Sequence, residues 1–284
     1  MRVIPATGLA AILLLPVLAL IGAASPHRAS QLSSSASYFG FDRNVYPGDG
    51  ALPALRQSFS FTSYWLGPPP GEKRSSWLGK RSLLQSQGFG FLLLYAAPDS
   101  SKIKTAAVAR RMWTADAQSA ARLATQEGFP KDSVIFLDIE EGGRLPASYH
   151  VYLRACADEL NRQGFRAGVY ASAIPVKEGQ GVSITTTIDI AAHDDQLVIW
   201  AYNDACPPSP GCNSAPQSLQ PPQSGFASAV VWQYAQSPRR RELTAKCPAS
   251  YAPDNNCYAP TDTARRWFLD LNLSNLADPS APRK

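Results

Sequence analysis

The stretch Val134-Ile-Phe-Leu-Asp-Ile-Glu-Glu141, followed by Gly142-Gly143, decides the fold assignment. Its four leading apolar residues predict a buried strand, and the acids and glycines after them predict that the strand ends in a loop. Side chains two residues apart on a strand share a face, so Asp138 and Glu140 should emerge together. Two adjacent carboxylates repel each other, which favours a retained proton on one of them. General acid catalysis on a glycosidic bond needs this arrangement, although solvated acids at a strand end give the same pattern.

A glycine-phenylalanine pair precedes this strand and recurs along the chain before other apolar segments. The pairs begin at Gly88, Gly128, Gly164 and Gly225. Glycine fits the left-handed position after a last helical turn, and the following phenylalanine packs back on that turn. The first three pairs therefore predict helix ends followed by buried strands. Their spacings of 40 and 36 residues are typical of repeated strand–helix units.

Eight strands are predicted in all, with helices at 108–126 and 145–163. The strands are 38–42, 59–65, 90–95, 134–138, 167–171, 197–202, 229–234 and 268–273. This order predicts an α/β fold, a single (β/α)8 TIM-type barrel. We expect it to be somewhat irregular in the last third, where the Pro-rich segment 206–223 takes the place of a regular helix.

The N-terminus predicts export. Arg2 precedes an apolar run from Leu9 to Ala24 that ends in small residues, which is typical of a secretory signal peptide. An uncleaved anchor is the alternative. We expect residues 1–24 to be the signal peptide, 25–36 a flexible linker, 37–276 the (β/α)8 barrel and 277–284 a disordered tail. The protein would then be secreted or periplasmic, with no stable membrane span after signal cleavage.

Cysteine usage agrees with export. Cys206 and Cys212 bracket one Pro-rich loop, and Cys247 and Cys257 bracket another, so each pair is expected to form a disulfide. Cys156 lies inside a helical pattern and is expected to be a buried thiol.

Composition excludes several other classes of protein. With 45% hydrophobic and 17% charged residues the chain is globular rather than disordered. The net charge of +5 is scattered, without the basic and aromatic interleaving of a nucleic-acid-binding surface. His27, His150 and His193 share no ligand spacing, and the cysteine spacings match no zinc site. We therefore expect no metal and no organic cofactor.

Barrels of this type carry their active sites at the C-terminal ends of the strands. The predicted ends supply four candidate catalytic acids, namely Glu140, Asp138, Asp42 and Asp270. They also supply candidate substrate-binding side chains, namely Tyr95, Tyr170, Trp200, Tyr202, Trp232, Gln233 and Asn272. Aromatic faces beside hydroxyl and amide groups suit a sugar ring, which has apolar faces and polar edges. Taken singly, each of these aromatics is more often explained by packing of the barrel, and it is their convergence on one mouth that favours a site.

Five motifs occur in a fixed order along the chain. They are Gly40-Phe-Asp42, Phe136-Leu-Asp-Ile-Glu140, Gly168-Val-Tyr-Ala-Ser172, Trp232-Gln-Tyr234 and Leu269-Asp-Leu-Asn272. In this order they resemble the family 25 glycoside hydrolases and, more closely, the glycoside hydrolase-like domains of the DUF1906 (Rv2525c-like) group. The resemblance covers roughly Ser37 to Leu276 and implies a barrel that acts on a cell-envelope polysaccharide, with peptidoglycan as the leading candidate.

The resemblance also implies a role for each acid. Glu140 would protonate the leaving oxygen, and Asp138 would stabilise the oxocarbenium-like state or an oxazolinium formed by a substrate N-acetyl group. Asp42 and Asp270 would orient the sugar or tune the proton affinity of the pair. One departure is Arg43, which follows Asp42 where the lysozyme-type members tend to carry a small residue. Two alternatives therefore stay open: a catalytically inactive glycan-binding or envelope-structuring barrel, and an ordinary barrel whose acids serve stability alone.

Overall fold

A computed structural model describes Met1 and residues 37–204, 219–236 and 269–283. The chain divides into two units, residues 1–34 and 35–284, and the architecture below is that of the second unit. Apart from Met1, the predicted signal peptide, the linker and both predicted cysteine pairs lie outside the described residues.

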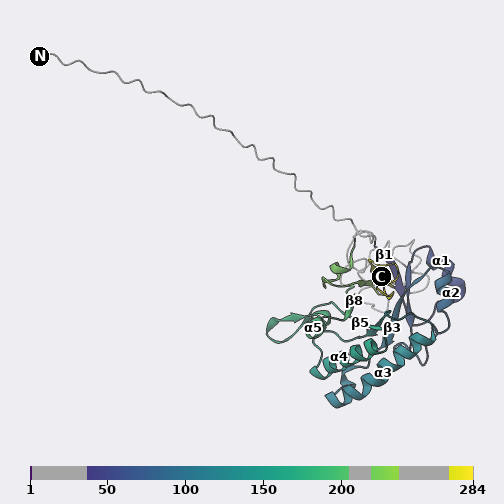
Figure 1. The fold of residues 1–284 in the computed structure, drawn as a ribbon, viewed down its shortest axis with the longest axis horizontal. Coiled ribbons are helices and arrows are strands. Elements are labelled where there is room, and N and C mark those ends of the chain that lie inside the picture. Colours follow the sequence, from purple (N-terminus) through teal and green to yellow (C-terminus); the bar gives the residue numbers. More distant parts are fainter. Residues whose placement is uncertain (2–36, 205–218, 237–268, 284) are drawn as a thin grey trace, which may run out of the picture. The chain divides into compact units, whose positions relative to one another are not determined.

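The described strands close into a barrel with helices on its outside (Figure 1). Around the barrel the order is β1-β10-β9-β8-β5-β4-β3-β2. The barrel strands are β1 (Tyr38–Asp42), β2 (Phe61–Trp65), β3 (Gly90–Ala96), β4 (Val134–Asp138), β5 (Arg166–Ser172), β8 (Val198–Tyr202), β9 (Val231–Ala235) and β10 (Asp270–Ser274). The α/β barrel predicted from the sequence is confirmed, and each observed strand overlaps its predicted range.

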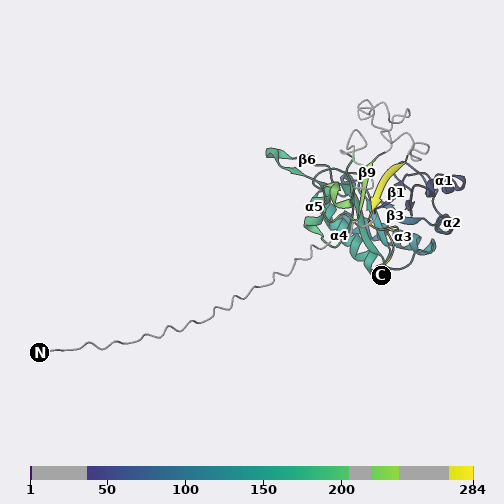
Figure 2. The ribbon, with the colours of Figure 1, turned by 90° about the horizontal axis from the view of Figure 1, so that it is seen from above.

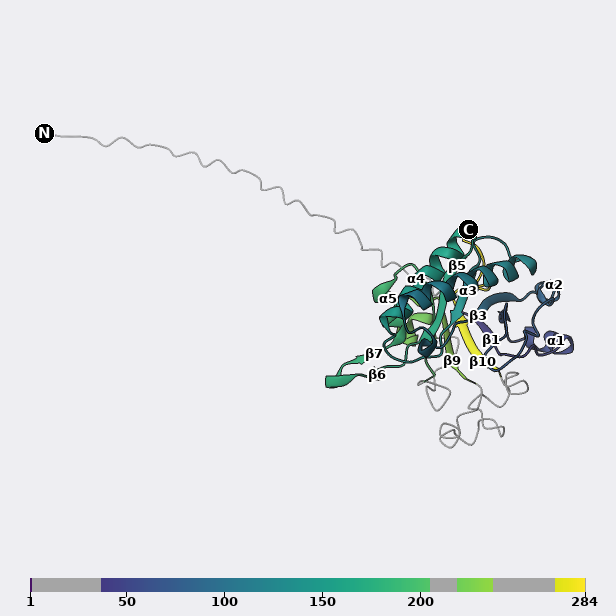
Figure 3. The same ribbon diagram turned by 90° about the horizontal axis from the view of Figure 1, so that it is seen from below.

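The helices are α1 (Leu52–Arg56), α2 (Arg81–Ser86), α3 (Ala106–Gln126), α4 (Ala147–Arg162) and α5 (Thr186–His193), with 3-10 turns η1 (Asp49–Ala51), η2 (Ser100–Lys102), η3 (Gly179–Gly181) and η5 (Pro221–Ser224). The two long helices α3 and α4 lie side by side on the outside of the barrel (Figures 1 and 3). A hairpin of β6 (Val176–Lys177) and β7 (Ser183–Ile184) projects from the barrel beside α5 (Figure 2). Within the described residues, no helix has the length and apolar character needed to cross a membrane.

The glycine-phenylalanine pairs end helices as predicted. Gly88, Gly128 and Gly164 have φ angles of 85°, 79° and 82°, which a residue with a Cβ rarely adopts. The amide of the following phenylalanine donates to a carbonyl five residues back in each case, with distances of 3.1, 2.9 and 2.9 Å. These bonds are those of the Schellman motif, so the last carbonyls of α2, α3 and α4 are satisfied before the next strand begins.

The direction of the last strand differs from the regular (β/α)8 pattern. β10 is antiparallel to both of its neighbours, β1 and β9, whereas the other barrel pairs are parallel. Asp270 is therefore the first residue of β10 and not, as predicted, a residue near its C-terminal end. It still lies at the mouth formed by the C-terminal ends of the other strands, because β10 runs in the opposite direction and Asp270 is paired with Asp42.

Large aromatic rings fill the barrel interior opposite glycines. A Cβ on Gly40 would lie 2.0 Å from the ring of Phe61, and a Cβ on Gly168 would lie 2.6 Å from that of Phe136. Both distances are far inside van der Waals contact, so only glycine leaves room for these rings. The interior below the mouth is consequently packed and does not form a channel.

The C-terminal segment is built into the fold, which corrects the prediction of a disordered tail at 277–284. Ser280 is buried, its Oγ accepts from the amide of Leu93 at 2.9 Å, and its carbonyl accepts from the amide of Val134 at 3.0 Å. The carboxylate of Asp278 accepts from the amide of Phe91 at 2.9 Å. Residues 278–280 therefore satisfy backbone donors of β3 and β4 at the start of the ladder between these two strands.

Candidate functional site

Strand register decides which predicted site residues face the barrel interior. Residues paired across neighbouring strands share a face, and that face alternates along each strand. Asp138 pairs with Tyr170, Tyr170 with Trp200, and Tyr202 with Gln233. Continuing around the barrel, Gln233 pairs with Asn272 and Asp270 with Asp42. These side chains form a single inward-facing belt at the mouth.

Two predicted substrate-binding residues do not belong to this belt. Tyr95 pairs with Leu137, and its hydroxyl is hydrogen-bonded to Ser119 of α3, so it lies on the outer side of β3. Trp232 is adjacent in sequence to the inward-facing Gln233 and so faces outward, where its Nε1 donates to the carbonyl of Asn203 at 2.9 Å. Both rings pack the outside of the barrel, and the prediction that they line the mouth was wrong.

The four predicted acids gather around Tyr170. This tyrosine is buried, and its pKa is raised well above the usual value, first by burial and then by the charges of Glu140, Asp42, Asp138 and Asp270. The structure thus brings together all four carboxyl groups, which the sequence spreads over more than 220 residues.

Asp42 is the shared acceptor in the hydrogen-bond network of the mouth. Its Oδ2 accepts from Gln233 Nε2 at 2.9 Å and from Asn272 Nδ2 at 2.6 Å. Each amide is fixed from its other end, because Tyr170 donates to Gln233 Oε1 at 2.8 Å and Trp200 Nε1 donates to Asn272 Oδ1 at 3.0 Å. Burial, followed by the charge of Asp270, raises the pKa of Asp42 well above its usual value, and the two amide donors only partly oppose that shift.

Asp138 and Glu140 form an unequal pair. Asp138 is buried, with 5% of its surface exposed, whereas Glu140 is exposed. Burial, then the charges of Glu140 and Asp42, raise the pKa of Asp138 well above its usual value. Partial burial also raises the pKa of Glu140, but the hydrogen bond from Asp138 lowers it. That shared hydrogen bond favours the proton on the inner carboxyl of Asp138 and the charge on Glu140.

The loop that carries Glu140 is held at several points. Glu141 accepts from the amide of Ser100 through its carboxylate and from Thr186 Oγ1 through its carbonyl at 3.1 Å. Further along, the amide of Leu145 donates to the buried Asp189 at 2.9 Å. These bonds tie the loop to the start of η2 and to α5, so Glu140 is presented by a restrained backbone.

Two polar residues near the mouth were missed by the sequence analysis. Asp204, only 3% exposed, accepts from the Tyr202 hydroxyl at 2.8 Å, and burial raises its pKa to about 6. Gln236 Nε2 lies 3.3 Å from Gln233 Oε1 and 3.5 Å from the Tyr170 hydroxyl. The available signal was position, since each lies one or two residues beyond the end of a barrel strand.

His150, Asp189 and His193 lie close enough together to be tested as metal ligands. The two imidazole rings are stacked, with centroids 3.7 Å apart and planes inclined by 16°. An ion in the plane of one ring would then lie well outside the plane of the other, where the second nitrogen lone pair does not point. Asp189 is already bound by Arg144 Nη1 at 3.2 Å. The cluster is suited to an ion-pair network and not to a shared cation.

The cavities of the described fold include one near each end of the barrel. One of about 770 Å³ lies at the N-terminal ends of β4 and β5, opposite the mouth, and is lined by polar residues including Asp132, Arg154 and Arg166. The other, of about 260 Å³, lies at the C-terminal ends of β2 and β3, outside the inward-facing belt.

Residues 79–206 match the model of the Rv2525c-like, glycoside hydrolase-like domain family. The resemblance predicted from the sequence is therefore confirmed over these residues, which are similar to the Rv2525c-like, glycoside hydrolase-like domains. A search of curated proteins gives no match.

Solved structures with a similar course of the chain include an uncharacterised protein from B. stearothermophilus, with 18% identity, a TM-score of 0.53 and coverage of 84% of this chain and 95% of that one. At this identity the likeness concerns the fold alone. Another is the Tat-secreted protein Rv2525c of Mycobacterium tuberculosis in complex with HEPES, with 16% identity, a TM-score of 0.48 and coverage of 87% and 98%. A third is the modular autolysin LytC of Streptococcus pneumoniae in complex with a synthetic peptidoglycan ligand, with 13% identity, a TM-score of 0.47 and coverage of 84% and 46%.

Proposed function

We propose that this protein is a secreted or periplasmic glycoside hydrolase that cleaves a cell-envelope polysaccharide, with peptidoglycan as its substrate. The observation that carries the proposal is the gathering of Asp42, Asp138, Glu140 and Asp270 around Tyr170 at one end of the barrel. Acids with raised pKa values beside aromatic and amide groups form the chemical setting of glycosidic bond cleavage. The ordered motifs and the family of residues 79–206 support the same substrate class.

In this proposal Glu140 is the acid that meets the glycan, because it is the exposed member of the pair. In the free protein its shared proton favours Asp138. Binding of the glycosidic oxygen next to Glu140 would draw that proton across the hydrogen bond and on to the leaving oxygen as the C1–O bond breaks. Asp138, now ionised, would stabilise the positive charge that develops on the sugar. Water would then add to C1 and give up one proton to the Asp138–Glu140 pair, which restores the starting protonation.

In this scheme Asp42 and Asp270 have two tasks: they orient the sugar, and their charges tune the proton affinity of the Asp138–Glu140 pair. Asp42 is fixed by two amide donors, so it offers a fixed carboxyl group to the sugar. The charge of Asp42 also raises the pKa of Asp138. Of the candidate substrate-binding side chains in the belt, Tyr202 is partly exposed and would contact the ring. Tyr170, Trp200, Gln233 and Asn272 are buried and would support Asp42 from beneath. The proposed reaction requires no metal ion and no organic cofactor.

The experiment that tests the proposal is a product assay. Purified wild type, Glu140→Gln and the matched control Glu72→Gln, which changes an exposed acid, are incubated with peptidoglycan and a panel of polysaccharides. We expect new reducing ends from wild type and Glu72→Gln and none from Glu140→Gln. Equal turnover by Glu140→Gln would refute the assignment of Glu140. Sedimentation with the cell wall in the absence of any product would instead identify an inactive glycan-binding barrel.

A further inference from the structure

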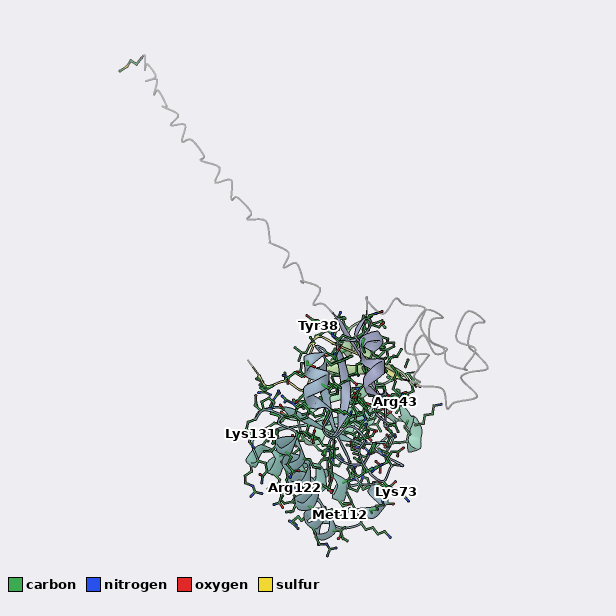
Figure 4. The ribbon with its side chains drawn as sticks, turned by 90° about the vertical axis from the view of Figure 1, so that its right-hand side faces the viewer. Tyr38, Arg43, Lys73, Met112, Arg122 and Lys131 are labelled. Atoms are coloured by element: carbon green, nitrogen blue, oxygen red, sulfur yellow. The ribbon has the colours of Figure 1, made fainter. Side chains whose placement is uncertain are left out.

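The rim of the barrel carries a small cavity beside the acid cluster. It measures about 260 Å³, and its walls include Pro68, Tyr95, Ala97, Pro98, Met112 and Asp116. Pro68 follows β2, Ala97 and Pro98 follow β3, and the other side of the cavity is the first half of α3, where Figure 4 labels Met112. We call this cavity the rim pocket.

The rim pocket is one strand away from the proposed reacting acids. Ala96, at the end of β3, pairs with Asp138, and the amide of Ala97 donates to the Asp138 carbonyl at 3.1 Å. The backbone of Ala97, which forms one wall of the pocket, is therefore hydrogen-bonded directly to the backbone of Asp138. A polymer lying across the mouth can place a side group over β3 and into the pocket.

The side chains that line the rim pocket are apolar except for Asp116 and the hydroxyl of Tyr95. Pro68, Pro98 and Met112 offer carbon and sulfur surface, and the ring of Tyr95 forms part of the wall. Asp116 is half-buried, and its Oδ2 accepts from the Tyr152 hydroxyl at 2.9 Å. Within the described residues, no lysine or arginine forms an ion pair with Asp116.

The carboxylate of Asp116 is half-buried, and its hydrogen-bond donor, the Tyr152 hydroxyl, carries no charge. Such a carboxylate is stabilised by binding a cation. Burial accordingly raises the pKa of Asp116, against the hydrogen bond from Tyr152. An aromatic ring and a methionine sulfur beside it are suited to an alkylammonium group, which combines an apolar stem with a positive end. The volume of about 260 Å³ is below the range of pockets that hold a whole drug-sized ligand, so a side group fits better than a glycan chain.

We propose that the rim pocket binds a primary ammonium group on a short aliphatic stem, such as the free amine of a peptide substituent on the polysaccharide. The glycan part of this inference rests on the proposed function, and it narrows the substrate to peptidoglycan whose peptides carry a free amine. Asp116 binds the ammonium group, Tyr152 holds the carboxylate in place, and the apolar walls pack against the stem.

Binding of small probes tests the pocket without any turnover. The ¹⁵N-labelled full chain is titrated with Nα-acetyl-lysine methylamide and, separately, with Nα,Nε-diacetyl-lysine methylamide, which lacks the charge. We expect the free-amine probe to shift the amide signals of Gly67 and Ala97, and the diacetyl probe to bind at least about 10-fold more weakly, since loss of a charge-assisted bond costs about 1.4 kcal/mol or more.

Variants assign the effect to Asp116. Asp116→Asn keeps an oxygen acceptor for Tyr152 and should fold, yet it should weaken the free-amine probe at least about 10-fold. Ala97→Leu fills the cavity from its wall without touching Asp116 and should weaken the same probe. Asp158→Asn, on the exposed surface of α4, is the matched control and should bind like wild type. Equal binding of both probes, or unchanged binding by Asp116→Asn, would overturn the proposal.

Sedimentation with peptidoglycan links the pocket to the polymer. Wild type should bind untreated peptidoglycan more tightly than peptidoglycan whose free amines have been acetylated, and Asp116→Asn should remove that difference. Equal binding of the two polymers by wild type would refute the glycan part of the inference. If cleavage is never observed while the probes depend on Asp116, the pocket stands and the hydrolase proposal falls.

Discussion

Asp42 and Asp270 face each other directly across β1 and β10, as the last pair in the register of two antiparallel strands. Each is the residue of its strand nearest the mouth, so two carboxyl groups that the chain separates by 228 positions meet side by side. The charge of Asp270 is the second cause, after burial, of the raised pKa of Asp42.

The first prediction concerns this pair. Asp270→Asn removes the negative charge beside Asp42, so the pKa of Asp42 should fall towards its usual value. The measurement is a ¹³C NMR titration of the Asp42 carboxyl carbon in both proteins. Asp49→Asn, which changes an exposed acid paired with Lys80, is the control and should leave the Asp42 titration in place. An identical titration in wild type and Asp270→Asn would show that the two charges do not interact.

The second prediction concerns stability and pH. Burial and two neighbouring acids raise the folded-state pKa of Asp138 above its unfolded value, so folding favours its protonated form. Its contribution is fully present below pH about 4 and is lost as pH rises through the raised pKa. Asp138→Asn cannot ionise, so the variant should be more stable than wild type at pH 7 by about 1 kcal/mol or more, or about 2–4 °C in Tm.

Urea unfolding of wild type and Asp138→Asn at pH 4 and pH 7 measures this effect. The gain should shrink towards zero at pH 4, and Glu72→Gln should show no such dependence on pH. In the proposed reaction Asp138 is needed as an anion, so the stabilised variant should also lose glycan cleavage. A variant less stable than wild type at pH 7 would contradict the sign of the argument.

The barrel was predictable because its signals are local. Each buried strand is a short apolar run, and a glycine with positive φ closes the helix before it, as at Gly128 and Gly164. The direction of β10 was not predictable in this way, because the alternation Leu269-Asp-Leu-Asn-Leu273 reads the same when the strand is reversed. Asp270 was placed at the mouth correctly, but through a strand direction that was wrong.

Part of the candidate site was likewise predictable from the sequence and part was not. The four acids could be found from strand ends, whereas the side on which each aromatic lies depends on register to a single residue. Trp232 and Gln233 are neighbours on one strand and cannot share a face, so predicting both as substrate-binding was inconsistent with the strand itself. The amide network of Gln233 and Asn272 joins three strands, and no local pattern encodes such a connection.

The third prediction concerns the C-terminal segment. Ser280→Ala removes the acceptor of the Leu93 amide in a buried position, which should cost about 1–3 kcal/mol. Ser86→Ala, at an exposed helical serine, should change stability by less than about 0.5 kcal/mol. Urea unfolding compares the two. A chain ending at Leu276 should be destabilised further than Ser280→Ala, whereas a disordered tail would allow both changes without effect.

The fourth prediction concerns the close packing of Gly168 against Phe136 inside the barrel. A Cβ at position 168 would lie 2.6 Å from Phe136 Cδ1 and 2.9 Å from Val134 Cγ1, so Gly168→Ala should destabilise the fold by about 1–3 kcal/mol through overpacking. Phe136→Leu alone should also destabilise it, because it leaves a cavity. In the double variant the shorter side chain makes room for the new methyl group, so the two costs should not add, and the coupling should be about 0.5–3 kcal/mol.

Gly168→Ala should also change the pKa of Asp42. Phe136 packs edge-on against Trp200 with centroids 5.8 Å apart, and Trp200 donates to Asn272, which in turn donates to Asp42. A displaced Phe136 would move Trp200, loosen the Asn272 amide and remove a donor that lowers the Asp42 pKa. Gly168→Ala should therefore raise the pKa of Asp42 in the NMR titration, and Phe136→Leu in the same chain should restore it. The argument would be contradicted if the two stability changes were additive and the Asp42 titration were the same in Gly168→Ala as in wild type. The interior would then adjust around position 168 without affecting the hydrogen bonds at the mouth.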